Sequence, residues 1–169
     1  MRTTKHFALF FILCLFCQPI LAQHRVRLAG LPPFERVVLI VKYFEGLHNK
    51  PKDFPYVGYG HRLQPGEHFT ADMTERQADS LLRADLWKCF EHFKEYGKDA
   101  LLLSLLAYNV GVGRLLGYGK YPKSKLLRKI EAGDRNYYWE YVSFCRYKGK
   151  VLKGLVKRRQ VEYYLFRVQ

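Results

Sequence analysis

The sequence predicts a mostly α-helical α+β fold, in which a small N-terminal lobe with a short β-hairpin and a helical C-terminal lobe flank a cleft. Apolar residues recur at three- and four-residue steps over several long segments, which is the helical period. Residues 48–63 are instead rich in proline, glycine and aromatic residues, which is typical of turns and short strands. The 169 residues suffice for one hydrophobic core but not for two ordinary domains. We therefore expect a single domain.

The first 22 residues have the pattern of a secretory signal peptide. Basic residues near the start precede an apolar run over residues 7–17, and Ala22 is a small residue suited to cleavage before Gln23. A transmembrane anchor, the alternative, needs about 20 apolar residues, and this run is interrupted by a glutamine and a proline. We expect residues 1–22 to be removed and the mature domain, residues 23–169, to be periplasmic or secreted.

The chain is strongly basic. It has 29 Lys and Arg against 15 Asp and Glu, and loss of residues 1–22 removes two basic residues and no acidic one, which leaves a net charge of +12. Such a chain attracts polyanions: cell-wall polymers, anionic membrane surfaces or nucleic acid. Export counts against nucleic acid. We expect a monomer with peripheral association to anionic wall or membrane surfaces and no nucleic-acid partner.

Two cysteines belong to the expected mature chain, Cys89 and Cys145. An oxidising compartment permits a disulfide between them. Two buried free thiols are the alternative, because cysteine packs well as a small hydrophobic residue. The sequence leaves both open.

The first helix is predicted over residues 34–44, where apolar side chains cover one face and part of another. Pro32 and Pro33 suit its entry. Its C-terminal end delivers Glu45, and Gly46 is available for a left-handed cap.

A second, long amphipathic helix begins at Thr74, which forms a capping box with Gln77, and is predicted to end near Gly97. The next segment is apolar nearly all round, as in a helix buried at the centre of a lobe. In chain order, the remaining helices are predicted within residues 99–113, 124–133, 136–144 and 155–166.

Two carboxylates, Glu45 and Asp53, lie close together in this basic chain. Hydrolysis of a glycosidic bond needs such a pair, one protonated acid for the leaving oxygen and one ionised group. Carboxylates that simply pair with lysines are commoner, so the pair by itself does not establish this chemistry.

The neighbouring motifs add a resemblance. In order along the chain they read FEGL, VGYGH, MTERQADSLLRADL, AYNVGVG, SKLLRKIEAGD and GKVLKGLVKRRQVE. This series resembles the phage-type lysozymes, glycoside hydrolase family 24, over essentially the whole mature chain. The resemblance implies a lysozyme-like fold and a muramidase that cuts the β-1,4 bond between N-acetylmuramic acid and N-acetylglucosamine in peptidoglycan. It leaves open whether the role is prophage lysis, wall remodelling or attack on competitors.

The resemblance also implies roles for the acids. Glu45 corresponds to the family's catalytic glutamate, as general acid, and Asp53 to its aspartate, which activates water or stabilises the oxocarbenium-like transition state. The sequence departs from the family pattern here. Only seven residues separate Glu45 from Asp53, one fewer than usual, and Tyr56 stands where the family has a supporting threonine. A peptidoglycan-binding protein with weak or no catalytic activity is therefore the alternative function.

Other polar residues have two interpretations each. His61 is expected to orient the hairpin through Asp85 on the long helix, with proton transfer as the alternative. Tyr108 and Asn109 could bind sugar acetamido or hydroxyl groups, or serve as core packing and a helix cap. The charge run over residues 157–159 is expected to be mostly solvated.

Metal and nucleotide sites are not indicated. The histidines of the mature chain lack the spacing of two ligands on one helix face, and GVGRLLG misses the dinucleotide-binding fingerprint and follows a helix rather than a strand. We expect no metal and no cofactor.

Overall fold

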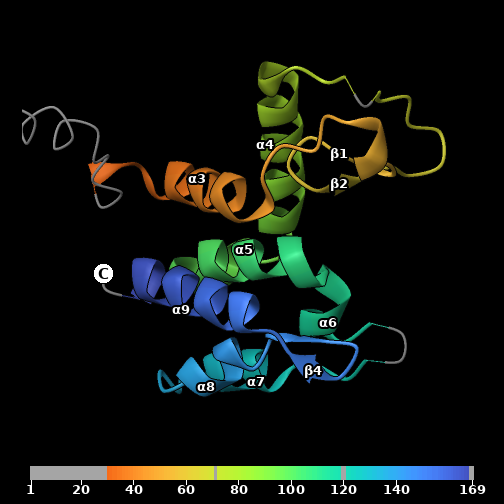
Figure 1. Cartoon of the computed structure of the whole chain (residues 1–169). Coiled ribbons are helices and arrows are strands. Elements are labelled where there is room, and N and C mark those ends of the chain that lie inside the picture. Colours follow the sequence, from red (N-terminus) through yellow and green to blue (C-terminus); the bar gives the residue numbers. More distant parts are fainter. Residues whose placement is uncertain (1–29, 71, 119–120, 168–169) are drawn as a thin grey trace, which may run out of the picture. The chain divides into compact units, whose positions relative to one another are not determined.

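The computed structural model describes residues 30–70, 72–118 and 121–167 (Figure 1). The chain separates into two units, Met1–Leu31 and Pro32–Gln169, and the second is described here. The predicted signal peptide, residues 1–22, lies outside the described residues. Within the described part of the chain, no helix has the length and apolar character that crossing a membrane requires.

The predicted first helix is confirmed as α3, Pro33–Glu45. Proline in its first turn fits because its missing N–H would have no helical partner there. The cap differs from the prediction. Gly46 has φ 69° but ψ 174°, so it leaves the helix in an extended direction instead of the left-handed helical one, while its N–H still donates to the Lys42 carbonyl.

The predicted turns and short strands are also present. A 3₁₀ turn, η2 (Pro51–Asp53), precedes the two antiparallel strands β1 (Tyr56–Val57) and β2 (His61–Arg62). Val57 lies opposite His61 in the register. This hairpin is the small sheet next to α4 in Figure 1.

Helix α4 runs over Glu75–Glu91 and has the predicted capping box between Thr74 and Gln77. The predicted end near Gly97 is wrong, because the helix stops at Glu91. The chain then turns to bury Phe93 completely and continues as a 3₁₀ segment, η3 (Lys94–Asp99). Gly97 has non-helical angles inside that segment, φ 55° and ψ −120°.

The remaining elements form the helical part of the unit. In order they are α5 (Ala100–Val110), α6 (Val112–Leu116), α7 (Lys125–Glu131), α8 (Tyr138–Val142), β3 (Arg146–Tyr147), β4 (Lys150–Val151) and α9 (Lys153–Arg167). The antiparallel hairpin β3–β4 was not predicted. Its turn residues, Lys148 and Gly149, both have positive φ, 47° and 80°, and lysine at the first of these positions gives no turn signal.

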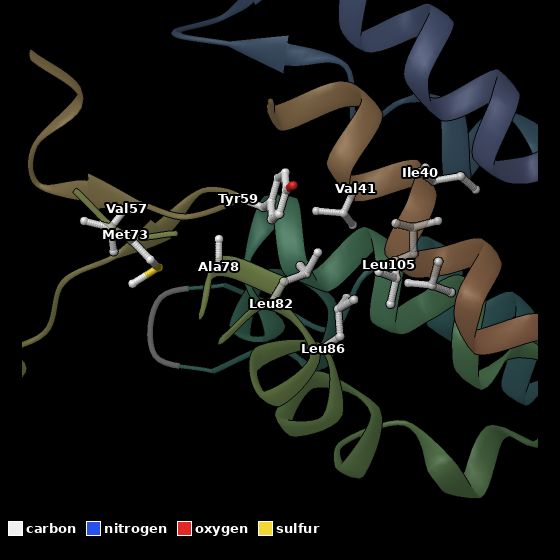
Figure 2. Packing of buried hydrophobic residues seen from close by; sticks show 11 residues of the cluster. Ile40, Val41, Val57, Tyr59, Met73, Ala78, Leu82, Leu86 and Leu105 are labelled. Carbon is white, nitrogen blue, oxygen red and sulfur yellow. The ribbon is translucent and has the colours of Figure 1, made fainter. Parts of the chain in front are cut away.

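Two hydrophobic clusters form the core, and α5 contributes to both. The first joins α3, the β1–β2 hairpin and α4, with Val41, Val57 and Leu82 inside it and Leu105 of α5 at its side (Figure 2). The second lies among the C-terminal helices and includes Leu103 from α5. The fold is therefore mostly helical with a small hairpin sheet, as predicted.

Cys89 and Cys145 are free thiols. Cys145 is buried, and burial raises the pKa of the Cys89 thiol to about 11. Of the two alternatives, two buried free thiols is confirmed for Cys145 and in part for Cys89, which is unpaired but only partly buried.

Candidate active site

Glu45 is the last residue of α3, and its carboxylate lies between Arg158 and Gly60. Oε1 accepts a hydrogen bond from Arg158 Nη1 at 2.5 Å. Oε2 faces Gly60, where a Cβ atom would lie only 3.3 Å away. The side chain of Glu45 is 21% exposed, so the fixed carboxylate still reaches solvent.

The loop after α3 is hydrogen-bonded both to the end of α3 and to the chain at Gly58. His48 exchanges two backbone hydrogen bonds with Gly58, of 2.7 and 2.9 Å. The His48 ring donates from Nε2 to the Glu45 carbonyl at 3.2 Å. The end of the helix and the β1–β2 hairpin are thereby joined directly beside the Glu45 carboxylate.

The expectation that residues 157–159 are mostly solvated is wrong for two of the three. Lys157 is exposed, but Arg158 and Arg159 are buried, with side chains 4% and 0% exposed. Both donate to Oε1 of the fully buried Glu162, Arg158 through Nε at 2.9 Å and Arg159 through Nη2 at 3.0 Å. The signal for this network was the glutamate at three and four residues along the same helix, a spacing that places opposite charges together.

The other oxygen of Glu162 accepts from the Tyr141 hydroxyl at 2.9 Å. Burial disfavours the charge of Arg158, but Glu45 and Glu162 outweigh burial and raise the pKa of that guanidinium. Burial raises the pKa of the Glu162 carboxyl, against the opposing effect of the two arginines. The network therefore supports a fixed cation next to Glu45.

Asp53 lies in η2, half-buried, and its carboxylate accepts from the Lys50 N–H at 3.2 Å. Tyr56 is 44% exposed, and its ring meets the His48 ring edge-on at 6.3 Å between centroids. Among the residues with described contacts, no hydrogen bond joins Asp53 to Glu45. The roles assigned to Asp53 and Tyr56 stay predictions.

His61 makes the predicted contact with Asp85, through Nδ1 at 2.6 Å. A second contact, between Nε2 and Glu67 at 2.7 Å, was not predicted. Burial opposes protonation of the ring, but the two carboxylates prevail and raise the pKa of His61. With a carboxylate at each ring nitrogen, His61 connects β2 to α4 through Asp85 and to the loop between β2 and α4 through Glu67.

Tyr108 and Asn109 both make hydrogen bonds within the protein. The Tyr108 hydroxyl donates to the carbonyl of Tyr59, next to Gly60, at 2.8 Å, and Asn109 Oδ1 accepts from Arg159 at 3.2 Å. Burial raises the pKa of the Tyr108 hydroxyl well above its usual value. Gly111, not Asn109, caps α5. Sugar binding by these two residues stays a prediction.

The part of the chain that the structure describes contains no group of three or more His, Cys, Asp or Glu side chains arranged to hold a metal ion. The groups that contact Glu45 include the Arg158 guanidinium, at its carboxylate, and the His48 imidazole, at its backbone carbonyl. The partly exposed Glu45 carboxylate can exchange a proton with a bound substrate.

The chain is similar to known proteins in sequence and in structure. The family model described as phage lysozyme matches residues 42–162, a range that contains Glu45, Arg158 and Glu162. An endolysin of Bacillus phage B103 is 34% identical over 145 residues, which are 75% of this chain and 51% of the relative. The chain thus spans about half the length of that curated relative.

A solved structure, the muramidase domain of SpmX from Asticaccaulis excentricus, is also similar. It has a TM-score of 0.62 and 26% sequence identity, and the match covers 79% of this chain and 95% of that domain. The family match over most of the chain and the shared fold together show that the chain belongs to the phage lysozyme family.

Proposed function

We propose that this protein is a muramidase that hydrolyses the β-1,4 bond between N-acetylmuramic acid and N-acetylglucosamine in peptidoglycan by acid/base catalysis. The observation that carries the proposal is the fixed, partly exposed carboxylate of Glu45 between Arg158 and Gly60. Membership of the phage lysozyme family and the likeness to a muramidase domain support it.

In this mechanism Glu45 acts in its protonated form, as the general acid of glycoside hydrolysis. It gives its proton to the leaving glycosidic oxygen and becomes the carboxylate that Arg158 contacts. Its carboxylate must be held accurately, because a misplacement near 1 Å can cost about a hundredfold in rate. Arg158 and the bare backbone of Gly60 provide that placement. Arg158 is in turn held by Glu162, so Glu162 acts as a positioning residue.

Asp53 is the second carboxylate of the proposal. In its ionised form it would activate the attacking water or stabilise positive charge on the sugar ring. Its hydrogen bond to the Lys50 N–H fixes it to its own turn. Tyr56, exposed on β1, is the candidate for helping to position the water.

The charge of the chain serves a different step. A basic surface concentrates the enzyme on the polyanionic wall, and the acids then perform the cleavage. We propose that the protein reaches the wall by export, with cleavage near Ala22, and that it acts as a monomer without a cofactor.

The test compares the wild-type chain with Glu45→Gln and Asp53→Asn in the release of reducing ends from purified peptidoglycan. We expect Glu45→Gln to lose roughly 10²- to 10⁴-fold in rate, the usual contribution of a general acid. Exposed Glu131, which pairs with Lys123, offers a matched control, Glu131→Gln, that should keep full activity. Full activity in folded Glu45→Gln would contradict the proposal.

Two observations favour a second function. The turn with Asp53 is one residue shorter than the family pattern, and the Asp53 carboxylate is engaged by its own backbone. The protein would then bind peptidoglycan without efficient cleavage. Folded wild-type protein that sediments with peptidoglycan but releases no reducing ends at any pH or salt concentration would establish this function instead.

A further inference from the structure

The hairpin β3–β4 and the first turns of α9 are rich in exposed cations, and residues 146–157 are here called the basic hairpin. No acidic residue occurs between Glu140 and Glu162. The exposed cations of the basic hairpin are Arg146, Lys148, Lys150, Lys153 and Lys157. Three apolar side chains are exposed among them, Tyr147 at 61%, Val151 at 49% and Leu152 at 42%.

Backbone pairing and turn geometry hold the two strands of the basic hairpin together. A two-residue turn with positive φ at both positions closes it, the geometry that matches the twist of two antiparallel strands. At its base, the Leu152 N–H donates to the carbonyl of buried Cys145 at 3.0 Å. At its tip, Arg146 donates to the Gly149 carbonyl at 3.1 Å. Figure 1 shows this hairpin as the connection from α8 to α9.

The charge of the basic hairpin is not neutralised within the protein. Among the residues that the structure describes, none of its exposed cations takes part in an ion pair, whereas other lysines do, such as Lys42 with Asp79 and Lys123 with Glu131. Lys148 lies over the Tyr147 ring, 5.5 Å from its centroid. The three exposed apolar side chains lie among these unpaired cations, so the basic hairpin presents charge and apolar surface together.

We propose that the basic hairpin contacts the surface of an anionic lipid bilayer. Lysine and arginine near an anionic membrane gain attraction to the lipid headgroups. Tyrosine is favoured at the boundary between headgroups and acyl chains, and aliphatic side chains are stabilised by entering that boundary. A hydrated wall polymer would satisfy the cations equally well but would leave Val151 and Leu152 in water. An anionic membrane therefore suits both the cations and the apolar side chains of the basic hairpin.

This inference goes beyond the proposed hydrolysis, which needs no membrane. Its test is sedimentation of the full chain with vesicles of phosphatidylcholine alone and with vesicles of phosphatidylcholine and phosphatidylglycerol in equal parts. The double variant Lys148→Gln, Lys150→Gln is compared with Lys98→Gln, Lys125→Gln, which removes the same charge from exposed lysines elsewhere. The N-terminal apolar run is common to all variants, so differences among them report the basic hairpin.

Each cation near an anionic membrane contributes about fivefold to the partition coefficient of a protein. We therefore expect the variant that lacks Lys148 and Lys150 to bind the anionic vesicles about 30-fold more weakly. The control variant should bind them almost as wild type does. A second variant, Tyr147→Ser with Leu152→Ser, keeps the charge and should bind more weakly even at low salt. These assays need no catalysis, so Glu45→Gln protein should bind vesicles like wild type, and loss of the muramidase proposal would leave this one intact.

Two outcomes would overturn the proposal. In one, the hairpin and control variants bind the anionic vesicles equally well, which would make the basic hairpin a solvated surface. In the other, the hairpin variant keeps vesicle binding and loses only sedimentation with purified peptidoglycan, which would assign the surface to the wall.

Discussion

Replacement of Gly60 by alanine tests whether the observed placement of Glu45 is the catalytic one. Gly60 has φ +94°, a conformation that L-residues rarely adopt, so alanine there should cost about 1–2 kcal/mol of unfolding free energy. The new Cβ atom would also lie 3.3 Å from Glu45 Oε2, closer than ordinary van der Waals contact. The carboxylate would have to move by a few tenths of an ångström.

The effect on catalysis follows from that displacement. If a shift near 1 Å costs about a hundredfold in rate, a shift of a few tenths should lower kcat by roughly threefold to tenfold. Gly133→Ala is the matched control, because Gly133 also has positive φ, +74°, but has no atom within 4 Å of the added Cβ. Both variants should lose stability by similar amounts in urea titrations, and only Gly60→Ala should lose kcat in the reducing-end assay.

Equal kcat values for the two variants would refute the reasoning. They would mean that the position of Glu45 against Gly60 is unimportant for the reaction. A large loss of kcat in both variants would also contradict it, because backbone strain far from Glu45 would then account for the effect.

Three further predictions concern stability and reactivity. Glu162→Gln removes the buried carboxylate that two arginines share and should lower the free energy of unfolding by about 3–5 kcal/mol. The control Glu131→Gln changes an exposed ion pair and should cost less than about 1 kcal/mol. Equal losses in urea titrations would contradict the stabilising role of the buried network. Because the pKa of His61 is raised in the folded protein, protonation of its ring stabilises the fold fully below pH 6.5, and this stabilisation is lost as pH rises through the raised pKa. The unfolding free energy of wild type should therefore fall over that pH range, while that of His61→Gln does not. Unfolding free energies that depend on pH in the same way for both proteins would refute this. Because burial raises the pKa of Cys89 to about 11, peptide mapping should show far slower alkylation of Cys89 at neutral pH in native than in unfolded protein, and equal rates would count against its burial.

Local signals predicted much of the fold. The capping box at Thr74 and Gln77 marks a helix start through contacts three residues apart, and it is present as predicted. The end predicted for the same helix, near Gly97, was wrong. Gly97 does mark a turn, but the chain leaves the helix earlier, where Phe93 is buried. The β3–β4 hairpin was missed because Lys148, a residue with no preference for positive φ, forms its turn.

The site was less predictable, since its contacts join distant parts of the chain. Glu45 was identified through the family motif, but its partner Arg158 is 113 residues away. A run of basic residues is normally exposed. Arg158 and Arg159 are instead buried, and besides Glu162 on their own helix they donate to Glu45 and Asn109, which are distant in the sequence. The contact of His61 with Asp85 was predicted correctly, and it joins β2 to α4 across 24 residues of sequence.

The most direct test of the muramidase proposal is the identity of the sugar at each new reducing end. Purified peptidoglycan is digested with wild-type protein, reduced with borohydride, hydrolysed in acid and separated by chromatography. Cleavage after N-acetylmuramic acid should yield the reduced form of muramic acid, and Glu45→Gln protein should yield almost none. Reduced glucosamine as the main product, or wall solubilisation without any new reducing end, would contradict the assignment.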